Sequence, residues 1–343
     1  MKKESPLTTK DFGVNTSPLA YWKANTYSDA DVMAVCQKID DIHAIKVDFL
    51  GDRRVNVILS RKVGQTMEGH VPAVVRFFRQ IVEAPGSPDL RGSFIVWVED
   101  GMWNTPYQHK APIFAFGKRY DDWVTFLMPD PAFIDAVGYK DDLAEIATTE
   151  EMIPWEKRKP ALFWRGSSSG MVSYRDDWKE SPRAVLVLTS KKLNDRSKLD
   201  AAFTKVVPYP DHPSVQEIPK LGLLDDPCKF SKFLEYRYLI DVDGEFCAWR
   251  SLFLKLASGS VVLKVQSDLE EWYHSKLIPW VHYIPINRSL SDLEDRMEWV
   301  RSHDKECKQI ASNASQLMRE IGYESERAEF GKLLSEILGS FRE

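Results

Sequence analysis

The sequence has 343 residues, of which 43% are hydrophobic and 28% are charged. This composition is typical of a soluble globular protein, and the length exceeds the needs of one ordinary domain, so we expect two packed units. There are 46 basic and 51 acidic residues, which gives a net charge of −5. This balance disfavours a protein that binds nucleic-acid phosphates, although it leaves room for a local basic cleft.

Membrane and export signals are not evident. No apolar run approaches the ~20 residues that span a bilayer, and the N-terminal MKKESPLTTKDFG has no apolar segment behind its lysines. We therefore expect neither a signal peptide nor a membrane-spanning helix. The cysteines lie far apart without a CxxC pair, at Cys36, Cys228, Cys247 and Cys307. This spacing predicts reduced thiols in a cytoplasmic protein, without a zinc site or a disulfide framework.

The first half of the chain alternates helical and strand patterns. Ser28 is placed to cap a helix over 28–42, with Asp31 three residues further on. The next predicted elements are a strand at 55–59, a helix at 71–83, strands at 94–98 and 113–116, and a helix at 140–147. These elements indicate an α/β unit.

The polar stretch 148–160 contains two prolines and is the predicted domain boundary. After it come strands at 161–164 and 238–242, a helix at 247–257, and strands at 260–265 and 281–284. Ser291 then caps a helix with Glu294 three residues on, and helices continue to the C-terminus. Alternating strands and helices predict parallel sheets in two Rossmann-like units.

Residues 166–170 read GSSSG directly after a predicted strand, which matches G-x-S-x-G. The motif suggests the nucleophile elbow of an α/β hydrolase, with Ser168 as the nucleophile. The following MVSYRDDWKES is too polar for the buried helix that such an elbow needs. The alternative is a phosphate-binding turn, in which backbone N–H groups and hydroxyls bind the anion and Arg165 or Arg175 adds charge. An ordinary turn is the third interpretation.

Asp241-Val242-Asp243 matches the D-x-D that holds a metal-bound nucleotide in one class of glycosyltransferases. An Asp-Gly turn after a strand explains these residues better.

Arg250 lies in the first turn of the helix predicted at 247–257, where a cation opposes the helix dipole unless an anion lies nearby. Its position favours phosphate binding, with a solvated arginine as the alternative.

Asp100 follows the buried strand predicted at 94–98, at the carboxyl end where α/β proteins place their chemistry. A carboxylate at this position suits a general base. Four other carboxylates remain alternatives for the role of base: Glu99, Asp121, Asp122 and Asp130. His282, inside a strand-like run, is better explained as a structural histidine.

Taken together, these segments resemble glycosyltransferase family 90, which holds capsule- and lipopolysaccharide-modifying enzymes and Rumi-like protein O-glucosyltransferases. The resemblance covers about 94–321 and rests on several motifs in the same order and spacing. They are PWEKRKPALFWRGSSSG, YRYLIDVDGEFCAWRSLFLKLASGSVVLK and EEWYHSKLIPWVHYIPI, followed by LSDLEDRMEWVRSHD. This combination supports neither the hydrolase nor the metal-site interpretation.

The resemblance implies a GT-B-like α/β fold of two Rossmann-like domains that face a cleft. It implies an inverting displacement in which Asp100, ahead of a phenylalanine-rich run ending at Lys118, is the catalytic base. The implied donor-binding residues are Arg165, Gly166, Ser167, Arg175, Phe246, Cys247, Ala248, Trp249 and Arg250. The match of Arg175 is looser, because the loop before it is about two residues longer than in the family.

We accordingly predict an N-terminal acceptor-side domain at 1–153, a sugar-nucleotide domain at 154–320, and a C-terminal helix at 321–343 that packs back on the first domain. The predicted enzyme moves a hexose or pentose, glucose or xylose foremost, from a UDP-sugar to a glycan, a lipopolysaccharide or capsule precursor, or a protein. We expect no metal, no cofactor and no nucleic acid, and a cytoplasmic location that leaves peripheral membrane association open. A sugar-nucleotide-binding protein without catalysis is the non-enzyme alternative.

Overall fold

The computed structural model describes residues 17–37, 43–60, 63, 70–102, 108–174, 177–209 and 211–342. The chain divides into two compact units. The first takes its described residues from Met1–Tyr139, Asp268–His274 and Ile321–Glu343, and the second from Lys140–Ser267 and Ser275–Glu320. The division at Tyr139 lies before the predicted boundary, so helix α6 (Lys140–Met152) belongs to the second unit.

The first unit contains a five-stranded sheet in the order β3-β2-β4-β5-β7. Strand β2 (Ala44–Gly51) is antiparallel to β3 (Arg54–Leu59) and β4 (Arg91–Trp97), whereas β4, β5 (Ile113–Ala115) and β7 (Phe126–Leu127) are parallel. The sheet is therefore mixed, which corrects the expectation of parallel strands alone. Asp52 and Arg53 both have positive φ values, at 50° and 58°. A two-residue hairpin of this kind forces its strands to run antiparallel.

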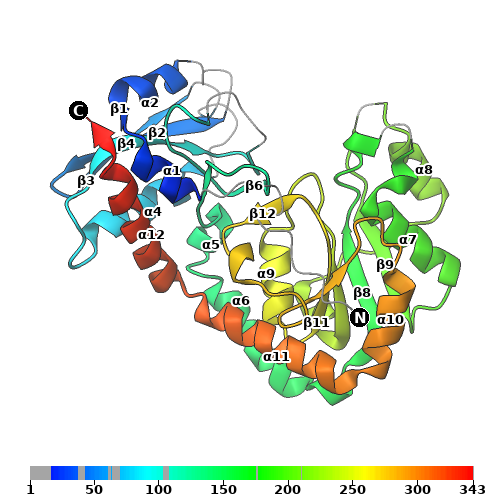
Figure 1. The fold of residues 1–343 in the computed structure, drawn as a ribbon. Coiled ribbons are helices and arrows are strands. Elements are labelled where there is room, and N and C mark those ends of the chain that lie inside the picture. The colour runs from blue at the N-terminus through cyan, green and yellow to red at the C-terminus, as the bar shows by residue number, and fades with distance from the viewer. Residues whose placement is uncertain are drawn as a thin grey trace. The chain divides into compact units, whose positions relative to one another are not determined.

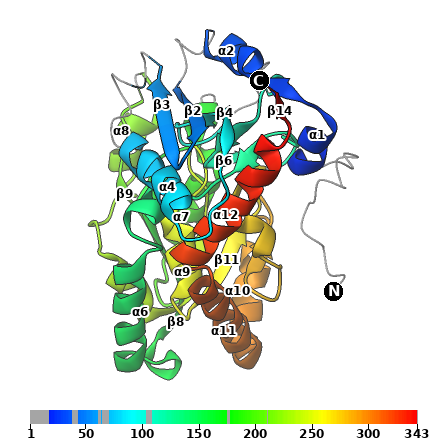
Figure 2. The ribbon, with the colours of Figure 1, turned by 90° about the vertical axis from the view of Figure 1, so that its left-hand side faces the viewer.

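Aromatic side chains fill the core of the first unit. Helix α4 (Val71–Glu83) has the predicted bounds and buries Phe77 and Phe78. Phe78 lies against Phe94 of β4, and Phe330 of helix α12 (Tyr323–Leu338) lies 5.4 Å from Phe77, ring centre to ring centre. Figure 2 shows α4 and α12 side by side. The C-terminal helix is thus part of this core.

Smaller elements complete the first unit. Ser28 caps α2 (Asp29–Cys36) in a capping box with Asp31, as predicted, while 38–42 of the predicted helix lie outside the described residues. The other elements are α1 (Pro18–Ala24), α5 (Pro131–Asp135), and the strand pairs β1 (Tyr27–Ser28) with β14 (Phe341–Arg342) and β6 (Gly117–Arg119) with β12 (Leu269–Glu271).

The second unit contains five parallel strands in the order β13-β11-β10-β8-β9. They are β8 (Lys159–Ser167), β9 (Leu199–Lys205), β10 (Tyr236–Asp241), β11 (Val261–Val265) and β13 (Ile284–Ile286). This is the flavodoxin-like order of doubly wound sheets, in which the direction of winding reverses between the first and third strands. Here that switch point lies between β8 and β10.

The remaining helices of the second unit are α7 (Pro182–Leu193), α8 (Ser214–Lys220), α9 (Arg250–Ala257), α10 (Leu293–Ser302) and α11 (Asp304–Glu320). Helix α11 packs against α9 and β11, as Figure 1 shows. Two local predictions are wrong. Val281 and His282 lie in a turn before β13, and Tyr283 forms an isolated bridge with Pro279. Asp292 rather than Ser291 precedes α10 and accepts a hydrogen bond from the Asn287 N–H.

The α/β class is confirmed, and two α/β units in one chain are the composition that a GT-B-like fold requires. None of the helices in the described ranges is long and apolar enough to cross a membrane. The four cysteines are free thiols.

Candidate functional site

The carboxyl ends of β8 and β10 form the candidate site of the second unit. In open α/β sheets, ligands bind beyond the carboxyl ends of the strands at the switch point. The GSSSG turn follows β8 at this edge, and the loop that begins at Val242 follows β10. The two segments that the family resemblance assigned to the donor are therefore neighbours in the structure.

Arg183 links the two loops. It is the second residue of α7, and its guanidinium donates hydrogen bonds to the Ser167 carbonyl at 3.0 Å and the Ser169 hydroxyl at 2.6 Å. The same guanidinium donates to the Val242 carbonyl at 3.0 Å and the Asp243 carbonyl at 3.1 Å. Burial lowers the pKa of Arg183, while Asp243 and Asp241 oppose that shift.

Sequence reasoning missed Arg183. A signal was present, because an arginine in the first turn of a helix opposes the helix dipole, and the same argument singled out Arg250. Arg175, the arginine chosen from the resemblance, lies outside the described residues.

Tyr209 brings a third loop to the same edge. Its hydroxyl accepts a hydrogen bond from the Gly170 N–H at 3.1 Å and donates to Glu245 at 3.2 Å. Tyr209 follows β9, so the loops after three neighbouring strands are joined. A pocket of about 620 Å³ opens beside this loop and is lined by residues that include Tyr209, His212 and Gln216.

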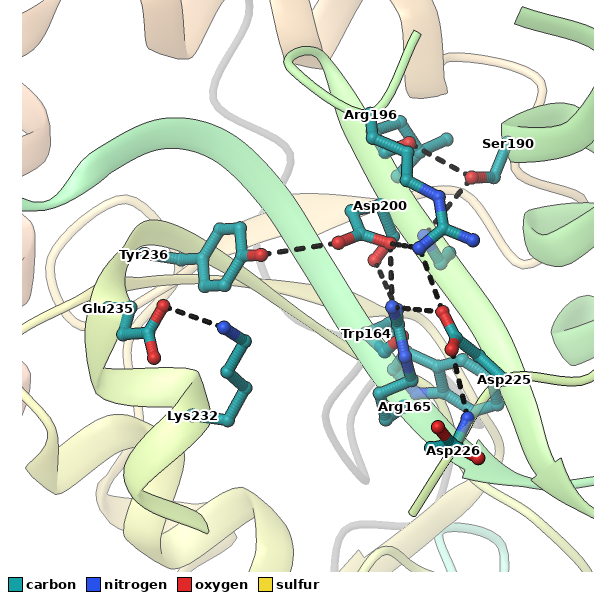
Figure 3. A network of polar contacts seen from close by, with 12 residues as sticks. Trp164, Arg165, Ser190, Arg196, Asp200, Asp225, Asp226, Lys232, Glu235 and Tyr236 are labelled. Atoms are coloured by element: carbon teal, nitrogen blue, oxygen red, sulfur yellow. Dashed lines mark hydrogen bonds and ion pairs between the residues drawn. The ribbon is translucent and has the colours of Figure 1, made fainter. Parts of the chain in front are cut away.

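Arg165 lies in an ion-pair network rather than at an open surface (Figure 3). Its guanidinium donates to Asp200 at 2.7 Å and to Asp225 at 2.8 Å, and it lies 4.7 Å above the centre of the Phe163 ring. Only 8% of its side chain is exposed. Because side chains alternate along a strand, Arg165 and the buried Trp164 face opposite sides of the sheet. Arg165 is thus held by two carboxylates at the end of β8, and its contact with the donor stays a prediction.

Gly166 and the serines shape the turn. A Cβ atom on Gly166 would lie 2.5 Å from the Trp164 indole, so a side chain here would force the buried indole to move. The Ser167 hydroxyl contacts that of Ser169 at 3.2 Å. Ser168 is fully buried, and its hydroxyl accepts a hydrogen bond from the Val207 N–H. A nucleophile elbow exposes its serine, so the hydrolase alternative is wrong.

The segment from Phe246 to Arg250 leads into α9, which begins at Arg250 rather than at the predicted position 247. Phe246 and Cys247 are buried, and the Ala248 N–H donates to Asp243 at 3.1 Å. Trp249 has a φ of +49°, which is a strained conformation for a bulky residue and is often found at functional sites. Arg250 donates from Nε and Nη2 to both carboxylate oxygens of Asp142 in α6.

The D-x-D carboxylates face lysines. Lys255 donates to the buried Asp241 at 2.8 Å, and the Lys264 ammonium lies 3.8 Å from Asp243. Burial would raise the pKa of Asp241, but Lys255, Lys264 and Arg183 outweigh it and lower that pKa. The two carboxylates are thus parts of a buried charge cluster below the loop. Among the described residues, no cluster of His, Cys, Asp and Glu has the arrangement of a metal site.

Asp100 belongs to the first unit, where it follows β4 and is exposed. Its rivals have structural contacts. Glu99 pairs with His43, and Asp121 pairs with Arg119 at 2.9 Å. Asp122 accepts from Gln108 at 2.6 Å, and Asp130 accepts the Ala132 and Phe133 N–H groups at the start of α5. Burial also raises the pKa of Asp130. These contacts leave Asp100 as the exposed carboxylate at this strand end.

Lys118 also has a structural role in the first unit. Its ammonium donates to the carbonyls of Asp122 and Thr125 and lies 3.4 Å from Glu270. Glu270 is in β12, so part of the third family motif pairs with the strand that follows the phenylalanine-rich run.

Comparisons with known proteins identify the family. The model of glycosyl transferase family 90 matches residues 95–325. The chain belongs to this family. It is 38% identical over 165 residues to protein O-glucosyltransferase 2 of Danio rerio, covering 48% of the chain and 29% of that protein. It is 30% identical over 225 residues to protein O-glucosyltransferase 1 of Rattus norvegicus, covering 60% and 51%. The matches thus span about half or less of these relatives.

Solved structures give a more distant likeness. One is the structure of Anabaena Alr3699/HepE in complex with UDP and glucose, to which this chain is 11% identical. The complex with UDP and glucose covers 78% of this chain and 76% of that chain, with a TM-score of 0.44.

Proposed function

We propose that this protein is a glycosyltransferase that moves a hexose or pentose, glucose first, from a UDP-sugar to a hydroxyl acceptor. Membership of family 90 carries this proposal. The names of the relatives support glucose as the sugar and a protein as the acceptor. The other acceptors to test are a glycan and a lipopolysaccharide or capsule precursor. We place the protein in the cytoplasm or at a membrane surface.

The second unit offers the groups that a sugar diphosphate needs. Transfer leaves negative charge on the departing diphosphate, which donors of positive charge stabilise. Arg250, at the start of α9, combines a guanidinium with a helix N-terminus. The Gly-Ser turn adds the hydroxyls of Ser167 and Ser169, and Arg183 holds the turn beside the loop after β10. In this proposal Arg165 acts indirectly, by fixing the end of β8.

The proposed reaction inverts the anomeric carbon by one displacement. The acceptor oxygen forms a bond to the anomeric carbon as the bond to the diphosphate oxygen breaks. The acceptor hydroxyl proton passes to the Asp100 carboxylate, because a hydroxyl is a poor nucleophile until a base removes its proton. UDP leaves with both electrons of the broken bond.

Asp100→Asn tests the base, because it keeps the shape of the side chain and removes its basicity. We expect turnover to fall by about 10² or more, the usual contribution of a general base. UDP affinity, measured by calorimetry, should stay close to that of the native protein. Asp121→Asn is the matched control, because Asp121 is a partly exposed carboxylate paired with Arg119. Near-native turnover in Asp100→Asn would contradict the assignment of Asp100 as the base. If the native protein binds the donor but shows no turnover, the non-catalytic alternative is favoured.

The proposed mechanism needs no metal, since arginines carry the charge of the leaving group. We expect transfer to be unchanged in excess EDTA. A loss of activity that manganese restores would instead assign Asp241 and Asp243 to a metal-bound nucleotide.

A thermal-shift screen over UDP-sugars identifies the donor, because a ligand at a hundredfold excess over Kd stabilises the native state by about 2.7 kcal/mol.

A further inference from the structure

The guanidinium of Arg250 is held by a carboxylate from another helix. Arg250 is the first residue of α9, and Asp142 lies in the first turn of α6. The pair is bidentate: Nε and Nη2 of Arg250 each donate to one oxygen of Asp142, and the Nε contact is 3.1 Å long. The Arg250 side chain is 47% exposed and the Asp142 side chain 22% exposed.

This geometry has the form of anion recognition. The planar fork of arginine binds a carboxylate and a phosphate in the same side-on manner. The Nε–Nη2 edge therefore cannot bind Asp142 and a phosphate group at the same time. A phosphate group that binds this edge would take the positions of the two Asp142 oxygens.

The pair can also exchange for a ligand. The Arg250 side chain is about half exposed, so water screens the pair, and it contributes less than a charge-assisted contact to a phosphate. Asp142 does not depend on Arg250 for a favourable position, because a carboxylate in the first turn of a helix interacts well with the helix dipole. Arg250 can thus leave Asp142 at small cost.

We propose that Asp142 and the diphosphate of the donor compete for the Arg250 guanidinium, and that the diphosphate displaces Asp142 when the donor binds. The inference rests on the proposed function. Asp142 then lowers the affinity of the site for diphosphate ligands, because it competes with them for Arg250. It pairs with Arg250 again when UDP leaves. Release of product is a common limit on turnover, and this exchange favours release.

Asp142→Asn tests the exchange, because it removes the charge, keeps the size and leaves an oxygen that still accepts a hydrogen bond. Calorimetry with inorganic pyrophosphate and with UDP measures the effect on binding. We expect Kd for both ligands to fall by about threefold to fivefold. In an Arg250→Ala background the same substitution should leave both Kd values unchanged.

Asp141→Asn is the matched control. Asp141 is the exposed neighbour of Asp142 in the same helical turn, so this variant removes the same charge without touching the pair. We expect Kd to change by less than about twofold, because exposed charges are screened by salt. Asp142→Ser serves as a second variant if Asp142→Asn does not fold, since serine is also favoured near helix N-termini.

The outcomes separate this inference from the proposed function. Weaker or unchanged binding in Asp142→Asn would overturn the exchange, as would equal tightening in Asp141→Asn. If the native protein binds pyrophosphate but no UDP, the UDP-sugar proposal fails, and the pyrophosphate comparison still decides the role of Asp142. If it binds neither ligand, both are overturned.

Discussion

Two arginines of the second unit, Arg165 and Arg250, were both predicted to bind the donor, and the structure places them in different surroundings. Arg165 is 8% exposed and lies between two carboxylates that themselves have further partners. Arg250 is 47% exposed and has a bidentate partner, Asp142. The sequence motif around each arginine is equally suggestive. The two arginines thus differ in burial, and substitutions at each test whether the buried one supports the fold and the exposed one binds the donor.

The largest expected effect is that of Arg165→Ala on stability. The variant leaves the buried Asp200 and the partly buried Asp225 without their central cation, and breaking such a pair costs about 3 kcal/mol. Urea denaturation measures the loss. Arg196→Ala is the matched control, because Arg196 pairs with Asp225 at 2.8 Å but is 69% exposed. An exposed pair contributes less than about 1 kcal/mol. Native-like stability together with lost UDP affinity would make Arg165 a direct ligand contact.

The Arg165 network also shows what the sequence could not predict. Local patterns predicted α4 to the residue, because an amphipathic helix with a proline near its start and Pro85-Gly86 after its end is defined within one window. Asp200 and Asp225 lie 35 and 60 residues from Arg165. No local pattern indicates which distant carboxylates will reach the end of β8, so the sequence could predict a phosphate contact for Arg165 but not the ion pairs that hold its side chain.

The same reasoning explains the other differences. The Asp52-Arg53 hairpin was overlooked because its sequence lacks the Asn-Gly or Asp-Gly pair that usually marks such turns. Arg183 was overlooked because its partners are backbone carbonyls of two loops that meet only in the folded sheet. The order of strands, which brings these loops together, is set by tertiary packing rather than by periodicity.

Arg250→Ala should affect binding rather than stability. A charge-assisted phosphate contact contributes roughly 1.5–3 kcal/mol, so UDP affinity should fall by about 10- to 100-fold. Arg250→Lys should restore only part of it, because the planar fork is lost. The free energy of unfolding should change by less than about 1 kcal/mol, since the Arg250 side chain is about half exposed and water screens its pair with Asp142. Calorimetry and urea denaturation of the same samples distinguish the two effects, and native UDP affinity in Arg250→Ala would make it a surface residue.

The smallest expected effect is that of Tyr236→Phe, which probes the edge of the Arg165 network. The Tyr236 hydroxyl donates to Asp200 at 3.2 Å, and its ring stacks on Phe163 at 4.2 Å. Burial, together with Asp200, raises the pKa of Tyr236, so the hydroxyl remains a donor at neutral pH. Phenylalanine keeps the stacking and removes the hydrogen bond, which should lower the free energy of unfolding by about 1 kcal/mol. UDP affinity should stay native, because Arg165 still holds Asp200 at 2.7 Å. A large loss of UDP affinity without a loss of stability would show that this network reaches the ligand, and Arg165 and Arg250 would then share one role.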